Sequence, residues 1–157
     1  MTKIREKTIH GLAAGDTFTV TRTFTESDMR MFAGITRDYN PVHFDERFAA
    51  AKNFKGKICH GLLAAGIITE IGGQIGWLAT GMDFRFIKPV YFEDTITCLF
   101  TIRSLDENGR AVADAIYKNQ DGTIVLEAVI TGILPDTRER MILSQMVAEG
   151  DPTNGLA

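Results

Sequence analysis

The stretch DYNPVH, residues 38–43, holds an aspartate and a histidine five positions apart. Aspartate and histidine side chains have ordinary pKa values of about 3.9 and 6.5, which suit general acid–base catalysis near neutral pH. The Asn-Pro pair between them restricts the backbone, and an asparagine side chain commonly bonds to nearby backbone in such a turn. The stretch therefore has two interpretations: an ordinary turn that ends a helix, or a turn that holds Asp38 and His43 against a substrate.

A second candidate feature is Cys59-His60-Gly61, which leads into an apolar segment. The N-terminus of a helix has unpaired N–H groups and a partial positive charge, and a glycine there lets a ligand approach the backbone closely. An anionic oxygen, such as the enolate of a thioester, suits such a place. Alternatively, Gly61 only permits tight packing, and the sequence leaves both interpretations open.

Asp38, His43, Asp45 and His60 are also of the residue types that bind metal ions. Their spacing matches neither the His-Glu-x-x-His pattern nor a Cys/His zinc pattern, so no metal is expected. A thiol nucleophile at Cys59 is also disfavoured, because residues adjacent in sequence rarely reach the geometry that such a nucleophile needs.

The composition is that of an ordinary soluble globular protein, with 45% apolar and 24% charged residues among 157. The formal net charge is −3 and no basic stripe stands out, so neither nucleic acid nor an anionic membrane surface is expected as the main partner. The N-terminus lacks the apolar core of a signal peptide, and the longest apolar run, from Gly61 to Ile68, is far below the roughly 20 residues that span a bilayer. Only two cysteines are present, so we expect a reduced, cytoplasmic protein.

The first part of the chain is expected to form a strand followed by short helices. Residues 16–24 alternate apolar side chains with threonines, which predicts a strand. N-capping side chains surround Ser27, so a helix should begin there and end at Asn40-Pro41, because the residue before a proline is pushed out of the α region. Residues 45–51 predict a short helical turn, and residues 52–57 a loop.

The apolar segment from Gly61 to about Leu78 predicts a buried central helix that frays near Gly72-Gly73. Its large apolar side chains suit either an acyl tunnel or an ordinary core, and they are Ile67, Ile68, Ile71, Ile75, Trp77 and Leu78.

The chain after this helix is rich in β-branched and aromatic residues. It predicts four strands, over residues 82–92, 95–104, 111–119 and 123–134. Turn signals separate the strands, and the strongest of these are Asn108-Gly109 and Asp121-Gly122. A strand, then helices, then an antiparallel meander predict an α+β fold in which one long buried helix packs against a sheet.

No linker or internal repeat divides the sequence, so a single domain is expected over residues 1–157. Its core should lie within about 15–134. The polar tail, 135–157, is expected to hold one helical segment, 139–147, and then a loose end from 150.

Taken together, these residues resemble a known family. DYNPVH (38–43) is similar to the signature D-x-N-P-[LIV]-H of MaoC-like (R)-specific enoyl-CoA hydratases. His60-Gly61 opens the central helix at a matching distance, and 86–90 (Phe-Ile-Lys-Pro-Val) and Asp94 follow in the same order. The resemblance spans roughly Gly15 to Leu134.

The resemblance implies a hotdog fold, in which a curled antiparallel sheet wraps around a long central helix. Members typically form dimers whose sheets join edge to edge, and they bind acyl-CoA through its pantetheine arm near the subunit interface. They add water to a trans-2-enoyl thioester, or remove it from the (R)-3-hydroxyacyl thioester, without a metal or redox cofactor. Coenzyme A would therefore be part of the substrate.

Position by position, the resemblance makes Asp38 and His43 the catalytic pair and makes the Gly61 N–H the group that polarises the thioester carbonyl. Such chemistry needs a base that takes a proton from water, an acid that protonates C2, and a stabilised enolate between these steps. We expect Asp38 and His43 to hold one water between them, with His43 as the proton acceptor.

The resemblance also implies a set of substrate-binding residues. Asn40 would brace the turn, Thr69 would place a small hydroxyl near the active-site water, and His60 adjoins the oxyanion donor. Arg37 departs from the family pattern, which commonly has glycine there, and this leaves the local backbone conformation open while the acid–base pair is unaffected. The Arg37 side chain could meet a CoA phosphate or simply lie in solvent.

Two other functions remain open from the sequence. One is a hotdog thioesterase in which Glu70 activates water. On an ideal helix, however, Glu70 lies opposite Gly61, which argues against a shared site. The other is an acyl-CoA-binding module without catalysis, which would not need an Asp–His pair.

Overall fold

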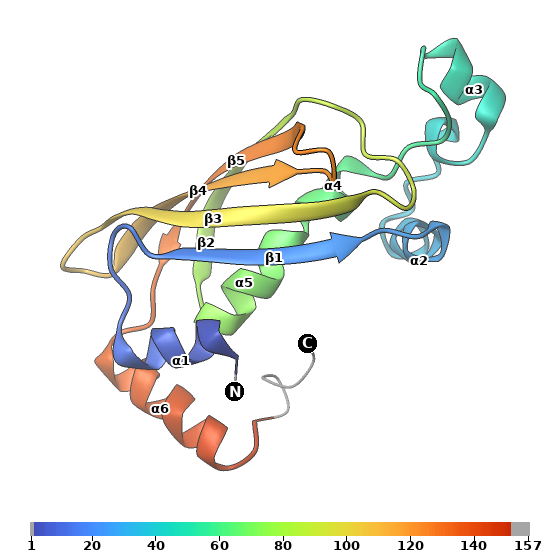
Figure 1. Cartoon of the computed structure of the whole chain (residues 1–157). Coiled ribbons are helices and arrows are strands. Elements are labelled where there is room, and N and C mark those ends of the chain that lie inside the picture. The colour runs from blue at the N-terminus through green and yellow to red at the C-terminus, as the bar shows by residue number, and fades with distance from the viewer. Residues whose placement is uncertain (1, 152–157) are drawn as a thin grey trace.

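A five-stranded antiparallel sheet curls around a central helix in the computed structural model, which describes residues 2–151 (Figure 1). The sheet has the strand order β1-β3-β4-β5-β2. Its members are β1 (Thr17–Thr23), β2 (Leu78–Phe86), β3 (Thr95–Leu105), β4 (Arg110–Lys118) and β5 (Ile124–Ile133). The predicted α+β class is therefore confirmed.

The helices lie in three places around this sheet (Figure 1). In chain order they are α1 (Lys3–His10), α2 (Glu26–Thr36), the 3₁₀ turn η1 (Pro41–His43), α3 (Glu46–Ala51), α4 (Gly61–Ala65), α5 (Ile67–Ile75) and α6 (Thr137–Ala148). Helices α4 and α5 pack against the inner face of the sheet, α1 and α6 lie together at one end, and α2 and α3 lie at the other. Among the described residues, no helix is long and apolar enough to cross a membrane.

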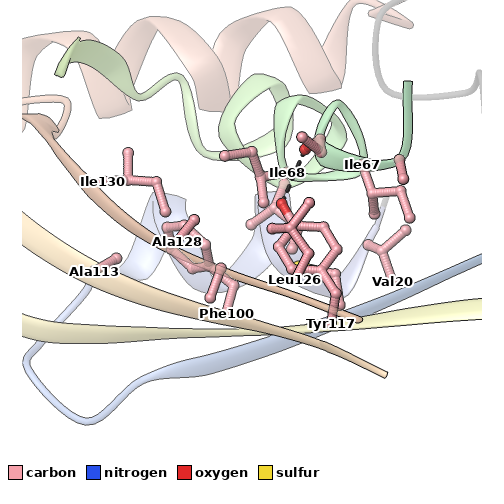
Figure 2. Close-up of a cluster of buried hydrophobic side chains, with 14 of the residues drawn as sticks. Val20, Ile67, Ile68, Phe100, Ala113, Tyr117, Leu126, Ala128 and Ile130 are labelled. Carbon is pink, nitrogen blue, oxygen red and sulfur yellow. Dashed lines mark hydrogen bonds between the residues drawn. The ribbon is translucent and has the colours of Figure 1, made fainter. Parts of the chain in front are cut away.

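The core lies between the sheet and α5. Alternate residues of β3 are buried, as a half-buried strand requires, and they meet the buried face of α5 (Figure 2). The alanines of β4 on the same face leave room for the helix. The sequence left open whether the large apolar side chains of this segment line an acyl tunnel or form the core. Four of them belong to the core, and they are Ile67, Ile68, Ile71 and Ile75, whereas Leu78 is exposed.

The prediction of one continuous central helix was wrong, because the chain forms two helices that meet at Gly66. The Tyr117 hydroxyl reaches from β4 into this break and donates to the Ala65 carbonyl at 2.9 Å (Figure 2). A side chain from the sheet therefore satisfies a carbonyl at the break. The sequence predicted no break at Gly66, because the brace comes from a residue about fifty positions away.

The second helix also ends earlier than predicted. It remains helical through Gly72 and Gly73, where fraying was expected, and closes at Gly76 in the left-handed conformation, with φ 76°. Strand β2 then begins at Leu78, which pairs with Ile133 of β5, rather than at residue 82.

Strand β2 also ends at Phe86 rather than at residue 92. Pro89 follows, and its missing N–H and fixed φ end the strand.

Helix α1 was not predicted, because its sequence is polar and shows no clear apolar face. It forms against the rest of the chain: Arg5 and Thr8 are buried, and an Arg5 guanidinium nitrogen donates to the Gly73 carbonyl at 3.3 Å. Helix α6 was predicted within two residues at each end, and Asp136 and Glu139 form a capping box at its start. The loose end predicted from residue 150 lies outside the described residues from 152 onward.

Tyr117→Phe is expected to lower the free energy of unfolding by about 1–3 kcal/mol, because the buried Ala65 carbonyl loses its donor. Chemical denaturation at fixed pH measures the change. The matched control is Tyr39→Phe at an exposed position, where a change within about 0.5 kcal/mol is expected. Equal effects of the two substitutions would contradict a role for the Tyr117 hydroxyl.

Candidate active site

The DYNPVH turn is built by its own side chains. One Asp38 carboxylate oxygen accepts the Asn40 N–H at 3.1 Å, and the Asn40 amide oxygen accepts the Val42 N–H at 3.2 Å. The Asn40 carbonyl accepts the His43 N–H at 3.0 Å, which opens the 3₁₀ turn. Asn40 therefore braces the turn as expected. It does not line the adjacent pocket, so a substrate contact by Asn40 stays a prediction.

His43 is held in one orientation beneath this turn. Its side chain is buried, and Nδ1–H donates to the Ile58 carbonyl at 2.8 Å, because a carbonyl oxygen can only accept. The unprotonated nitrogen is then Nε2. Burial lowers the pKa of His43 below its ordinary 6.5. Near neutral pH the ring is therefore neutral, and Nε2 can accept a proton.

Asp38 and His43 face the same cavity, of about 690 Å³, which is within the usual range for small-molecule sites. The Asp38 side chain is half exposed, and one polar atom from each of Asp38, His43 and His60 lies within 4.8 Å of the others. The remaining lining is mainly apolar and includes Phe32, Phe54, Leu62, Phe86, Ile87 and Val90. A carboxylate and a neutral imidazole therefore stand together at the wall of an apolar pocket.

Gly61 lines this pocket as the first residue of α4. The N–H of a first helical residue has no acceptor within its helix, so it is available to an anionic oxygen. A Cβ atom at position 61 would lie 2.6 Å from the ring of Phe86, which is closer than real contacts allow. The structure therefore needs glycine here for the close approach of Phe86.

Thr69 lies away from these residues. Its hydroxyl donates to the Gly66 carbonyl at 2.7 Å, and its side chain lines a different hollow beside Arg22 and Glu70. Thr69 is not among the residues that line the pocket of Asp38. Its contact with a substrate stays a prediction.

Glu70 forms an ion pair with Arg22 of β1 and does not line the pocket. The expected separation of Glu70 from Gly61 is therefore found, although the central helix is broken rather than ideal. Cys59 does line the pocket, but burial raises the pKa of its thiol to about 12, so the thiol is not ionised near neutral pH.

Asp38, His43 and His60 are also the one group among the described residues whose atoms are close enough to hold a metal ion. The two imidazole rings are stacked, with centroids 3.7 Å apart and planes 27° apart. Lone pairs lie in the ring planes, so in stacked rings they run nearly side by side instead of converging. Each ring also has one nitrogen bonded to a backbone carbonyl. This geometry favours acid–base chemistry, and the expected lack of a metal stays a prediction.

The backbone at Arg37 has the conformation for which the family pattern uses glycine. Arg37 caps α2 in the left-handed conformation, with φ 62° and ψ 21°, which glycine adopts without cost. A side chain there costs roughly 1–2 kcal/mol. The arginine therefore keeps the backbone shape that glycine would provide, at some loss of stability.

Arg37→Gly is expected to raise the free energy of unfolding by about 0.5–1 kcal/mol, since the relief of strain exceeds the added flexibility of the unfolded chain. Thermal and urea unfolding measure the change. The control is Arg30→Gly inside α2, which is expected to lower the free energy of unfolding by about 1 kcal/mol, because glycine is unfavourable within a helix. A loss of stability in both variants would contradict strain at Arg37.

Much of the apolar lining of the pocket was not predicted from the sequence. Residues 86–90 line it, whereas the family resemblance predicted their position in the chain and no role in the site. Phe32 of α2 also lines it, and only the apolar face of its helix hinted at burial. The contact between the His43 and His60 rings had no sequence signal, because the two residues are seventeen positions apart.

Comparison with known proteins agrees with this geometry. Residues 13–121 match the family model described as "MaoC like domain". The "(R)-specific enoyl-CoA hydratase" of Rhodospirillum rubrum is 31% identical over 125 residues, which are 77% of this chain and 87% of that protein. The mitochondrial "3-hydroxyacyl-[acyl-carrier-protein] dehydratase" of Arabidopsis thaliana is 28% identical over 131 residues, covering 80% of this chain and 79% of that protein.

The fold has a similar match among solved structures. The unliganded R-hydratase PhaJ1 from Pseudomonas aeruginosa superposes with a TM-score of 0.74 and 26% identity, over 82% of this chain and 85% of that one. The curled sheet and its central helix are thus those of the R-hydratases, and the predicted hotdog fold is confirmed.

Proposed function

The chain belongs to the MaoC-like domain family, and from this membership we propose that it catalyses the reversible (R)-specific hydration of trans-2-enoyl-CoA to (R)-3-hydroxyacyl-CoA. It is a hydro-lyase of the enoyl-CoA hydratase and 3-hydroxyacyl dehydratase class, as its named relatives are. The proposed reaction at this site is supported by one observation: Asp38, His43 and Gly61 line the same pocket.

The proposed mechanism gives each of these residues one task. A water molecule lies between the Asp38 carboxylate and His43 Nε2, and His43 takes a proton from it as the water oxygen bonds to C3. The C2–C3 double bond becomes an enolate, whose oxygen accepts the Gly61 N–H. The Asp38–His43 pair, which holds the proton taken from water, then delivers one proton to C2, and this restores the thioester carbonyl and the starting state of the pair. Acid–base catalysis of this kind contributes about 10²–10⁴-fold, and one oxyanion donor about 10²–10³-fold.

The pocket fits the acyl and pantetheine parts of such a substrate. Its lining is mainly apolar, with Lys88 as a cation at the wall. The proposal needs no metal or redox cofactor, because proton transfer and hydrogen bonding supply the chemistry. Activity unchanged after exhaustive dialysis against EDTA is the expected result, and loss of activity that added metal restores would contradict this part of the proposal.

We also propose that two copies pair through β2. This strand is an edge of the sheet, and its outer side pairs with no strand of residues 2–151. It exposes Leu78, Met82 and Phe86, which is unusual for an unpaired edge and suits burial against a second copy. Light scattering is expected to give the mass of a dimer or larger assembly, and Met82→Asp is expected to shift it toward the monomer.

The direct test is hydration of crotonyl-CoA, followed as loss of enoyl absorbance with chiral analysis of the product. The expected product is the (R)-3-hydroxy thioester. Release of free CoA without hydration would move the assignment to a thioesterase, and binding without turnover would move it to an acyl-CoA-binding module.

Glu70→Gln separates the thioesterase from the hydratase within the same assay. Because Glu70 pairs with Arg22 outside the pocket, we expect the substitution to leave kcat for hydration within about twofold. A fall of about 10²-fold or more would place Glu70 in the reaction and contradict the proposed site.

A further inference from the structure

His60 touches each of the three proposed catalytic groups, yet it presents almost no surface to a ligand. Its side chain is only 2% exposed, and the rings of Phe32, His43 and Phe44 lie around it. His60 is among the residues that line the pocket, and its role in substrate binding stays a prediction. A role that acts through its neighbours fits the burial better.

We propose that His60 is a positioning residue that holds Asp38, His43 and Gly61 in register, so that the three act on one substrate. This inference rests on the proposed function of the same site. Each of the three connections is a separate contact, and each can be tested by itself.

The first connection is to the backbone of Asp38. His60 Nε2 lies 2.9 Å from the Asp38 carbonyl oxygen, and the nitrogen must be the donor. The same nitrogen lies 3.7 Å from an Asp38 carboxylate oxygen. The hydrogen bond therefore fixes the start of the DYNPVH turn, while the carboxylate itself remains half exposed in the pocket.

The second connection is to the face of His43. The stacked rings, with centroids 3.7 Å apart, prevent the His43 ring from tilting toward His60. The Nδ1–H bond to Ile58 fixes the edge of the same ring. One contact on the face and one on the edge define where Nε2 points.

The third connection runs through the main chain. His60 is the N-cap of α4, its carbonyl accepts the Leu63 N–H at 3.1 Å, and Gly61 is the next residue. Anchoring the His60 ring therefore also anchors the residue that begins the helix. The turn, the imidazole and the oxyanion donor come from three segments, and His60 is the side chain that joins them.

The hydrogen bonds also assign the tautomer of His60. Nε2 carries the proton, because it donates to Asp38, and Nδ1 is buried without a hydrogen-bond partner among the described residues. A proton on Nδ1 in place of Nε2 would leave the Asp38 carbonyl without this donor and would bury an unsatisfied N–H. The Nε2–H tautomer is therefore the one that these hydrogen bonds support.

A matched pair of variants separates positioning from packing. In His60→Gln the side-chain amide reaches the place of Nε2 and keeps a donor to Asp38, whereas in His60→Asn the amide reaches only the place of Nδ1. Both variants lose the ring. A small misplacement of catalytic groups can cost about 10²-fold, so we expect His60→Asn to lower kcat by that order with KM within about threefold. The kcat of His60→Gln is expected to be at least about tenfold higher than that of His60→Asn.

His60→Phe completes the set, because it keeps a ring against His43 and loses the donor. Its kcat is expected to lie near that of His60→Asn, since the Asp38 contact is missing in both. His10→Gln, at an exposed histidine, is the control and should leave kcat unchanged. Circular dichroism and unfolding curves confirm that each variant is folded before its rates are compared.

Nitrogen-15 NMR of the wild-type histidines tests the inference without turnover. The titratable groups lining this pocket are Asp38, His43, Cys59, His60 and Lys88. Only three histidines are present, and exposed His10 is the reference. We expect His60 as the Nε2–H tautomer and His43 as the Nδ1–H tautomer.

Several results would overturn the proposal. An Nδ1–H tautomer at His60 would contradict the bond to Asp38. Equal kcat values for His60→Gln and His60→Asn would show that the donor to Asp38 does not matter and that His60 contributes only by packing. A rise in KM at constant kcat would return it to substrate binding. If the wild-type chain does not hydrate crotonyl-CoA, the proposed function fails, whereas the tautomers still decide whether His60 makes these contacts.

Discussion

Asp38→Asn and His43→Asn are each expected to lower kcat for crotonyl-CoA hydration by about 10²–10⁴-fold. The two changes are chosen to spare the fold. An asparagine at 38 still offers an oxygen to the Asn40 N–H, and an asparagine at 43 can place its amide where Nδ1–H meets the Ile58 carbonyl. Each variant therefore removes a proton-transfer group and retains the bond that shapes the turn.

The pH dependence provides a second readout of His43. Burial places its pKa below 6.5, so hydration should remain constant as pH falls toward 6.5 and decline only below it. The same shift has a consequence for stability. Because the folded chain binds this proton less readily than the unfolded chain, the contribution of His43 to stability is present above pH 6.5 and is lost as pH falls through the lowered pKa.

Unchanged kcat in either variant, with the fold intact by circular dichroism, would rule out the proposed pair. An acid limb that persists unaltered in His43→Asn would assign the titration to another group. Double substitution offers a further check, because two residues that hold one water are expected to be far from additive.

Gly61→Ala is expected to lower kcat/KM by about 10²–10³-fold, although alanine is a better helix former than glycine. The added Cβ would lie 2.6 Å from the Phe86 ring, so the ring must move. Phe86 is 55% exposed and can do so without unfolding the chain. The displaced ring then occupies space over the N-terminus of α4, where the thioester oxygen must bind.

The matched control is Gly73→Ala in α5, where a Cβ atom meets nothing within 4 Å. It should retain activity and gain up to about 1 kcal/mol of stability. In the Gly61→Ala background, Phe86→Ala is expected to restore activity by at least about tenfold, which makes the two effects non-additive. Full activity in Gly61→Ala alone would contradict Gly61 as the point where the substrate approaches the backbone.

Much of the fold could be predicted because its signals are local. The alternation in the strands, the Asn-Gly and Asp-Gly turns and the capping side chains act between near neighbours, and they placed most strands within two residues. The exceptions have distant causes. The break at Gly66 is braced by Tyr117, helix α1 depends on its packing under α5, and β2 starts early because β5 is available to pair with it.

The candidate site divides in the same way. The residues of the DYNPVH turn, with its Asx bonds and its proline, are local features, so the sequence by itself determined Asp38 and His43 as a possible pair and Gly61 as a possible donor. Only the tertiary structure decided that the three meet at one pocket, that Thr69 and Glu70 lie outside it, and that His60 is stacked on His43. The physical reason is that hydrogen bonds within a turn act between residues a few positions apart. A pocket is formed by side chains and backbone from segments that the sheet and its broken central helix bring together.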